Sequence, residues 1–128
     1  MTPEPSPFKS KGGVARLFSA LRYSAQGFAA AFRHEAAFRQ ELLLVAILVP
    51  VAMWISRSLT EMLLMIGVLA IVLVVELLNS ALEALADAIT LDHHALIGRA
   101  KDLGSAAVLL SLVLSAVVWG SIIASHWA

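Results

Sequence analysis

The residues of this 128-residue chain that could carry chemistry lie in its most apolar part. Glu76, Asn79, Glu83 and Asp87 come directly after an uncharged run from residue 62 to 75. On a helix of about 3.6 residues per turn these four side chains share one face, which we call the acidic stripe. A carboxylate inside a bilayer costs several kcal/mol unless it faces protein, water or a cation. The acidic stripe is therefore a candidate site.

The residue types around the cytoplasmic end of the stripe suit phosphoryl transfer to an alcohol. Glu35 and Glu83 offer the hard oxygen ligands that Mg²⁺ prefers. Lys101, followed by Asp102, offers an ammonium group for phosphate oxygens. Glu76 lies deeper and can take the proton of a hydroxyl group held at the headgroup depth of a lipid. Such a transfer depends mostly on positioning and charge neutralisation.

Other interpretations of the same residues compete with phosphoryl transfer. Intramembrane Glu, Asn and Asp side chains also suit a proton or cation path, or hydrogen bonds that join the helices of an oligomer. His93 and His94 suggest a metal site, although adjacent loop histidines are more often solvated. The chain contains no P-loop and no kinase glycine-rich loop, which excludes the common soluble ATP sites.

Composition indicates an integral membrane protein with one domain. The chain is 60% hydrophobic and 14% charged, and its mean hydropathy is +0.88, so a soluble fold of this length could not cover its apolar surface. The formal net charge of zero suggests no nucleic-acid partner. The absence of cysteine excludes disulfides and thiolate metal sites.

The first element expected is an amphipathic helix over about residues 14–34. Apolar side chains recur every three or four residues from Val14 to Phe32, and Arg16, Arg22 and Arg33 lie off this apolar side. This pattern is typical of a helix lying in the membrane interface, with packing against the chain's own helices as the alternative. Residues 1–13, which include three prolines, are expected to form a flexible tail.

Three membrane-spanning helices are expected next, over about residues 36–55, 62–89 and 103–127, so the fold class is all-α. A short outer loop precedes the second span, and a loop over residues 90–102 follows it. With Glu61 at the outer boundary, Glu76 lies about 22 Å and Glu83 about 33 Å along the helix. The hydrocarbon core is about 30 Å thick. Glu76 is therefore expected inside the core and Glu83 at its cytoplasmic interface.

The distribution of basic residues predicts the orientation of these spans. Only Arg57 lies between the first and second spans, and Arg99 and Lys101 lie between the second and third. By the positive-inside rule the N-terminus and the second loop are cytoplasmic and the C-terminus is outside. No cleavable signal peptide is expected, since no apolar region follows the first basic residues. The lysines and arginines before the first span are Lys9, Lys11, Arg16, Arg22, Arg33 and Arg39.

Three stretches of the chain resemble the prokaryotic diacylglycerol kinase family. They are residues 35–41 (Glu-Ala-Ala-Phe-Arg-Gln-Glu), 75–84 (Val-Glu-Leu-Leu-Asn-Ser-Ala-Leu-Glu-Ala) and 98–108 (Gly-Arg-Ala-Lys-Asp-Leu-Gly-Ser-Ala-Ala-Val), and the likeness extends over residues 14–127. The resemblance implies a homotrimer of three-span subunits, each with an N-terminal surface helix, and active sites completed by a neighbouring subunit. It implies ATP-dependent phosphorylation of diacylglycerol to phosphatidic acid, by direct transfer of the γ-phosphate, at the cytoplasmic face of a bacterial inner membrane.

The resemblance also assigns roles to residues. Glu76 is the expected catalytic base, Glu35 and Glu83 are expected to hold Mg²⁺ on the co-substrate ATP, and Asn79 and Asp87 support the site, Asp87 without an assigned role. The residues expected to bind ATP are Arg16, Tyr23, Glu35, Glu83, Asp92, His93, His94, Lys101 and Asp102. Those expected to bind the lipid are Arg16, Ala37, Phe38, Arg39, Gln40, Glu41, Glu76 and Ser105.

Two alternatives to a diacylglycerol kinase remain from the sequence. Relatives in the same family phosphorylate undecaprenol with the same base and metal ligands, although residues 35–41 and Arg16 resemble the diacylglycerol type. A non-enzymatic membrane oligomer or ion path is the second alternative.

Overall fold

The computed structural model describes residues 12–128, which form four α-helices and no strand. They are α1 (Val14–His34), α2 (Ala36–Ile55), α3 (Leu59–Ile89) and α4 (Ala95–Ser125). The all-α class expected from the sequence is confirmed. The chain divides into two units, residues 1–34 with α1 and residues 35–128 with the other helices. The tail expected over residues 1–13 lies, as far as residue 11, outside the described residues.

Helix α1 has the bounds that its hydrophobic periodicity predicts. Leu17, Phe18, Leu21 and Phe28, which belong to its apolar side, are all exposed. Basic Arg33 and His34 stand in the last turn, where a positive charge interacts favourably with the helix dipole. The guanidinium of Arg22 lies 5.4 Å from the ring centre of Tyr23. The unit thus presents an apolar side that the helix itself leaves uncovered.

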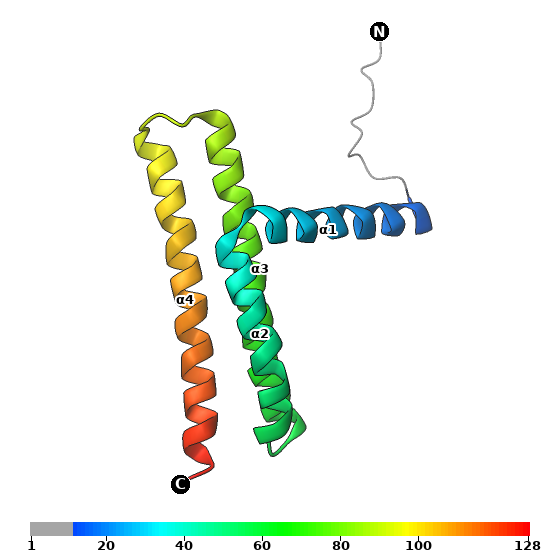
Figure 1. Cartoon of the computed structure of the whole chain (residues 1–128), viewed down its shortest axis with the longest axis vertical. Coiled ribbons are helices and arrows are strands. Elements are labelled where there is room, and N and C mark those ends of the chain that lie inside the picture. The colour runs from blue at the N-terminus through cyan, green and yellow to red at the C-terminus, as the bar shows by residue number, and fades with distance from the viewer. Residues whose placement is uncertain (1–11) are drawn as a thin grey trace. The chain divides into compact units, whose positions relative to one another are not determined.

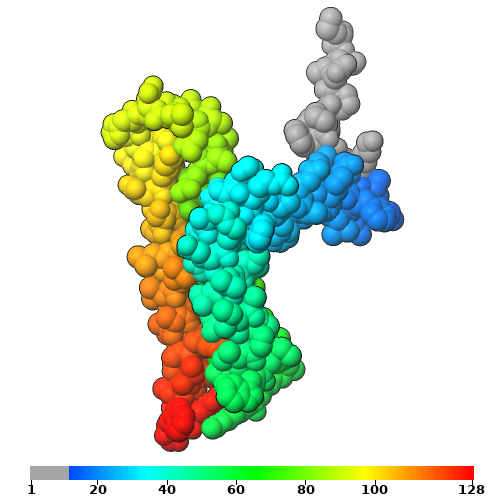
Figure 2. Space-filling model, in the orientation of Figure 1, coloured from blue at the N-terminus to red at the C-terminus, as the bar shows by residue number. Residues whose placement is uncertain are grey.

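Helices α2, α3 and α4 run side by side and alternate in direction (Figure 1). Each is long and apolar enough to cross a membrane. At about 1.5 Å per residue, the 31 residues of α3 and of α4 extend for about 46 Å, well beyond a hydrocarbon core of about 30 Å. Figure 2 shows α2 in front of much of α3, with α4 beside them. Three long apolar helices make this a membrane protein.

The core of the three-helix unit follows one face of α3. Met65, Val68, Leu69 and Val72, at the spacing of one helix face, are all buried. Phe38 of α2 packs into the same core with only 2% of its surface exposed, and Ala52 is also buried. The indole N–H of Trp119 donates to the carbonyl oxygen of Met65 at 3.0 Å, which joins α4 to α3. Helix α3 is therefore the central element.

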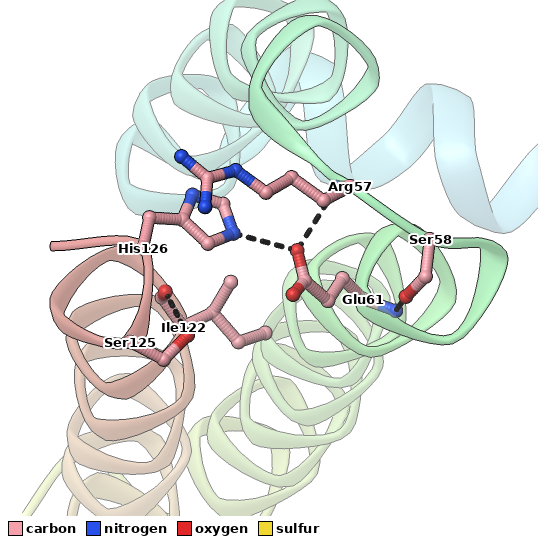
Figure 3. Close-up of polar contacts among 6 residues, drawn as sticks. All are labelled: Arg57, Ser58, Glu61, Ile122, Ser125 and His126. Atoms are coloured by element: carbon pink, nitrogen blue, oxygen red, sulfur yellow. Dashed lines mark hydrogen bonds and ion pairs between the residues drawn. The ribbon is translucent and has the colours of Figure 1, made fainter. Parts of the chain in front are cut away.

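Polar contacts also join α3 to the end of α4 at the end opposite the 90–94 loop (Figure 3). Glu61 Oε1 accepts a hydrogen bond from the backbone N–H of Arg57 at 3.0 Å and lies 2.7 Å from His126 Nε2. Ser58 Oγ accepts from the backbone N–H of Glu61 at 3.1 Å and so caps α3. We call these four residues the outer link.

Three helix boundaries differ from the sequence prediction. The cap by Ser58 starts α3 at Leu59, three residues before the expected boundary at 62. The loop expected over residues 90–102 is wrong, since it spans only residues 90–94. His94 Nδ1 accepts from the backbone N–H of Leu96 at 3.2 Å, and this cap starts α4 at Ala95. Residues 95–102, which include the charged Arg99, Lys101 and Asp102, are thus helical, and α4 ends at Ser125 rather than at 127.

Candidate functional site

Four carboxylates gather where the beginning of α2 meets the second half of α3. Glu76 is 4% exposed in the apolar interior. The carboxylates of Glu41, Glu83 and Glu35 lie close enough to interact electrostatically with that of Glu76. We call Glu35, Glu41, Glu76 and Glu83 the carboxylate cluster. Two of its members, Glu35 and Glu41, come from a segment that is far from the acidic stripe in the sequence.

The backbone conformation of Glu35 explains why its side chain can belong to the carboxylate cluster. It precedes α2 in an extended conformation, with φ of −114° and ψ of 105°, and its side chain makes no capping hydrogen bond. A carboxylate at a helix start often accepts from backbone N–H groups. That of Glu35 is instead left for another partner, and it is only partly exposed.

Lys101 connects the carboxylate cluster to the end of the acidic stripe. Its Nζ lies 2.7 Å from Asp87 Oδ1, and both side chains are partly exposed. The ammonium group also interacts electrostatically with Glu83. Asp87 ends the stripe on α3 and Lys101 lies in the second turn of α4, so the pair joins the two helices beside the loop. This contact gives Asp87 a partner in the structure, whereas the sequence left the role of Asp87 unassigned.

Asn79 stands between Glu76 and Glu83 on α3. Its Oδ1 is buried and has no hydrogen-bond partner among residues 12–128. A buried polar atom without a partner costs about 1–3 kcal/mol and usually has a functional or structural reason. The amide packs against Gly104 of α4. The structure thus holds the Asn79 side chain at the contact between α3 and α4.

The remaining expected residues are distributed along the three-helix unit and α1. Asp92 and His93 lie exposed in the loop, and His94 uses its Nδ1 to cap α4. Phe38 lies in the core and is almost fully buried. Arg16 and Tyr23 are exposed residues of α1. Of the residues expected at the site, those exposed on α2 and α4 are Ala37, Arg39, Gln40, Asp102 and Ser105.

An apolar groove of about 260 Å³ opens beside Glu41. Leu44 and Leu48 of α2, Leu69 of α3 and Trp119 of α4 are among its lining residues. Sequence reasoning did not identify this groove, because no local pattern shows where three apolar helices leave a gap. Its one carboxylate lies in the carboxylate cluster, so the groove begins at the candidate site.

The donor set suits a magnesium ion that arrives with a nucleotide. Within residues 12–128 no three His, Asp or Glu side chains are placed to hold a metal by themselves. Mg²⁺ is usually bound by one or two carboxylates together with substrate phosphates and water. Glu35 and Glu83, which both interact electrostatically with Glu76, are the two carboxylates that fit such a site. The adjacent His93 and His94 belong to no group of three or more potential metal-ligating side chains within residues 12–128.

Comparison with known proteins gives a consistent match along the chain. The sequence model of the family described as prokaryotic diacylglycerol kinase matches residues 22–123. A diacylglycerol kinase of Pseudomonas aeruginosa is 50% identical over 119 residues, which cover 93% of this chain and 97% of the relative. The diacylglycerol kinase of Haemophilus influenzae is 42% identical over 111 residues, which cover 87% of this chain and 94% of the relative. The diacylglycerol kinase of Escherichia coli K12 is 42% identical over 115 residues, which cover 90% of this chain and 94% of the relative.

Proposed function

Since the chain belongs to the prokaryotic diacylglycerol kinase family, we propose that it transfers the γ-phosphate of ATP to the hydroxyl group of diacylglycerol and so forms phosphatidic acid. The observation that carries this proposal is the carboxylate cluster with Lys101 beside it. These residues lie on or directly before three helices that are apolar enough to cross a membrane. A deep carboxylate, two shallower ones and an ammonium group are the parts that such a transfer needs.

Glu76 is the proposed catalytic base. Its burial among apolar residues of α3 puts a proton acceptor where water has little access, as expected for a group that meets a lipid hydroxyl. Taking the proton makes the lipid oxygen a better nucleophile as its bond to the γ-phosphorus forms, while the bond from that phosphorus to the bridging oxygen breaks and ADP leaves. Asn79, one turn away, supports this arrangement.

Glu35 and Glu83 are proposed to hold the magnesium ion of Mg-ATP. When bound, Mg²⁺ neutralises charge on the phosphate groups. The ammonium group of Lys101 contacts phosphate oxygens, and Asp87 keeps it near Glu83. The other proposed nucleotide contacts are Arg16, Tyr23, Asp92, His93, His94 and Asp102.

Diacylglycerol is proposed to approach through the bilayer along α2. Glu41 borders both the carboxylate cluster and the apolar groove, so a lipid whose hydroxyl meets Glu76 can place apolar chain in the groove. The other proposed lipid contacts are Arg16, Ala37, Arg39, Gln40 and Ser105, with Phe38 acting through the core. The relatives reported above are named diacylglycerol kinases, which does not favour undecaprenol as the substrate.

The proposed setting is the inner membrane of a bacterial cell. The N-terminus and the 90–94 loop face the cytoplasm, the C-terminus lies outside, and α1 lies in the cytoplasmic interface, as its exposed apolar side and its arginines suggest. We further propose a homotrimer in which a neighbouring subunit completes each site, an arrangement implied by the family resemblance.

The experiment is a phosphorylation assay with the purified protein in mixed micelles. γ-Labelled ATP, Mg²⁺ and dioleoylglycerol are supplied, and the lipids are extracted. We expect label in phosphatidic acid that disappears when Mg²⁺ is chelated. Absence of labelled lipid with Mg²⁺ present would contradict the proposal.

A further inference from the structure

Gly104 places the backbone of α4 against the side chain of Asn79 on α3. A Cβ atom added at this glycine would overlap Asn79 Oδ1, and it would lie 3.3 Å from Asn79 Cγ and 3.9 Å from Leu82 Cδ2. In glycine a hydrogen atom occupies that place. The amide of Asn79 therefore fits between the helices only because residue 104 has no side chain.

The contact also orients the amide. Oδ1 and Cγ are the two atoms nearest to the added Cβ position, and the amide nitrogen lies at least as far away as Leu82 Cδ2. The oxygen end thus faces α4, and the two N–H donors lie on the side away from Gly104. The terminal torsion of an asparagine is otherwise broad, so this contact removes freedom that the side chain would have.

The orientation matters because of where Asn79 lies. It follows Glu76 by three residues and precedes Glu83 by four, so all three side chains share one helix face. Amide N–H groups can donate to carboxylate or phosphate oxygens, whereas the buried Oδ1 has no donor among residues 12–128. An amide turned the other way would present an acceptor to these anionic groups.

We propose that Gly104 is a positioning residue of the kinase. By packing the backbone of α4 against the amide oxygen, it fixes Asn79 between the base and the metal carboxylates with its N–H donors turned away from α4. This inference rests on the proposed function and adds a residue outside the proposed catalytic and binding set. No other glycine in residues 12–128 has an atom within 4 Å of an added Cβ.

Matched glycine-to-alanine substitutions test the proposal in the full-length protein. Gly104→Ala is compared with Gly120→Ala on the same helix and Gly67→Ala on α3, two positions where an added Cβ meets nothing within 4 Å. A misplacement of a catalytic group by about 1 Å can lower the reaction rate on the order of 100-fold. We therefore expect Gly104→Ala to lower kcat by about 10–100-fold. The two controls are expected to stay within about twofold of wild type. A kcat of Gly104→Ala equal to that of the controls, or a change in KM alone, would overturn the proposal.

A double-mutant cycle separates positioning from a general structural effect. Asn79→Ala removes the group that the new methyl would strike, so adding Gly104→Ala to Asn79→Ala should cause little further loss of activity. The melting temperature, read without substrate, should fall in Gly104→Ala and recover in the double variant. Independent, additive losses would refute the coupling.

The outcomes also distinguish this inference from the proposed function. A wild-type protein that labels no lipid would overturn the kinase proposal, and the melting-temperature cycle would still test the contact. If Gly104→Ala does not purify, recovery of a folded protein in the double variant supports the contact, and failure of both variants contradicts it.

Discussion

Replacing Glu76 by glutamine tests the proposed base with little structural disturbance. The side chain is 4% exposed, and glutamine keeps its volume, so the substitution leaves no cavity of the kind that alanine would create. A positioned general base typically contributes about 10²–10⁴-fold to a rate, or about 3–5 kcal/mol of transition-state stabilisation. We therefore expect kcat to fall on the order of 10²–10⁴-fold, while the protein still folds.

The Michaelis constant for Mg-ATP gives a second readout. Glu76 interacts with the carboxylates of Glu41, Glu83 and Glu35, so the glutamine removes one negative charge from this cluster. An anionic nucleotide should bind a less negative site at least as well, so KM should not rise. The assay measures initial rates of phosphatidic acid formation in mixed micelles with each substrate varied.

Glu61→Gln is the matched control, since it makes the same change on the same helix. Glu61 belongs to the outer link, where it contacts His126 and the backbone N–H of Arg57. We expect its kcat to stay within about twofold of wild type. A near-wild-type kcat for Glu76→Gln, or equal losses in both variants, would refute the assignment of Glu76.

Three further variants test other parts of the site and fold. Glu83→Gln should raise KM for Mg-ATP by about tenfold or more with a smaller change in kcat, since a contact to a charged group contributes about 1.5–3 kcal/mol; an unchanged KM would contradict its role. Asp87→Asn should lower kcat/KM for Mg-ATP by less than Lys101→Met does. The first substitution removes only the carboxylate charge that lies 2.7 Å from Lys101 Nζ and orients it, whereas the second removes the ammonium group itself. An equal or larger loss in Asp87→Asn would show a different role. His126→Ala should lower the melting temperature by breaking the contact with Glu61 but leave kcat unchanged; an intact melting temperature would show that the outer link does not stabilise the fold.

The elements with strong periodicity could be predicted from the sequence. The bounds of α1 and α2 follow from apolar spacing and from the run that begins at residue 36. The loop over residues 90–102 was mispredicted for a physical reason. At 31 residues α4 is longer than a hydrocarbon core requires, so its first turns can carry Arg99, Lys101 and Asp102, and these charges do not indicate a loop. The His94 cap was the local signal that could have placed the start of α4.

The candidate site was predictable only in part. Glu76 and Glu83 are recognisable from the sequence of a single helix, because they are carboxylates within an otherwise apolar segment. Contacts between helices depend on how α3 and α4 pack, and no spacing in the chain predicts that Lys101 meets Asp87 or that Gly104 meets Asn79. The outer link could not be predicted from the sequence either, because Glu61 and His126 are 65 residues apart. The catalytic and binding roles themselves remain predictions.

The most direct test of the account is a competition between two lipid alcohols. Wild-type protein in mixed micelles receives Mg²⁺, γ-labelled ATP, and dioleoylglycerol and undecaprenol together at equal concentration. We expect label to appear preferentially in phosphatidic acid, and to be lost from both lipids in Glu76→Gln. Preferential labelling of the polyprenol would contradict the proposed substrate, and labelling of neither lipid by the wild-type protein would contradict the kinase function itself.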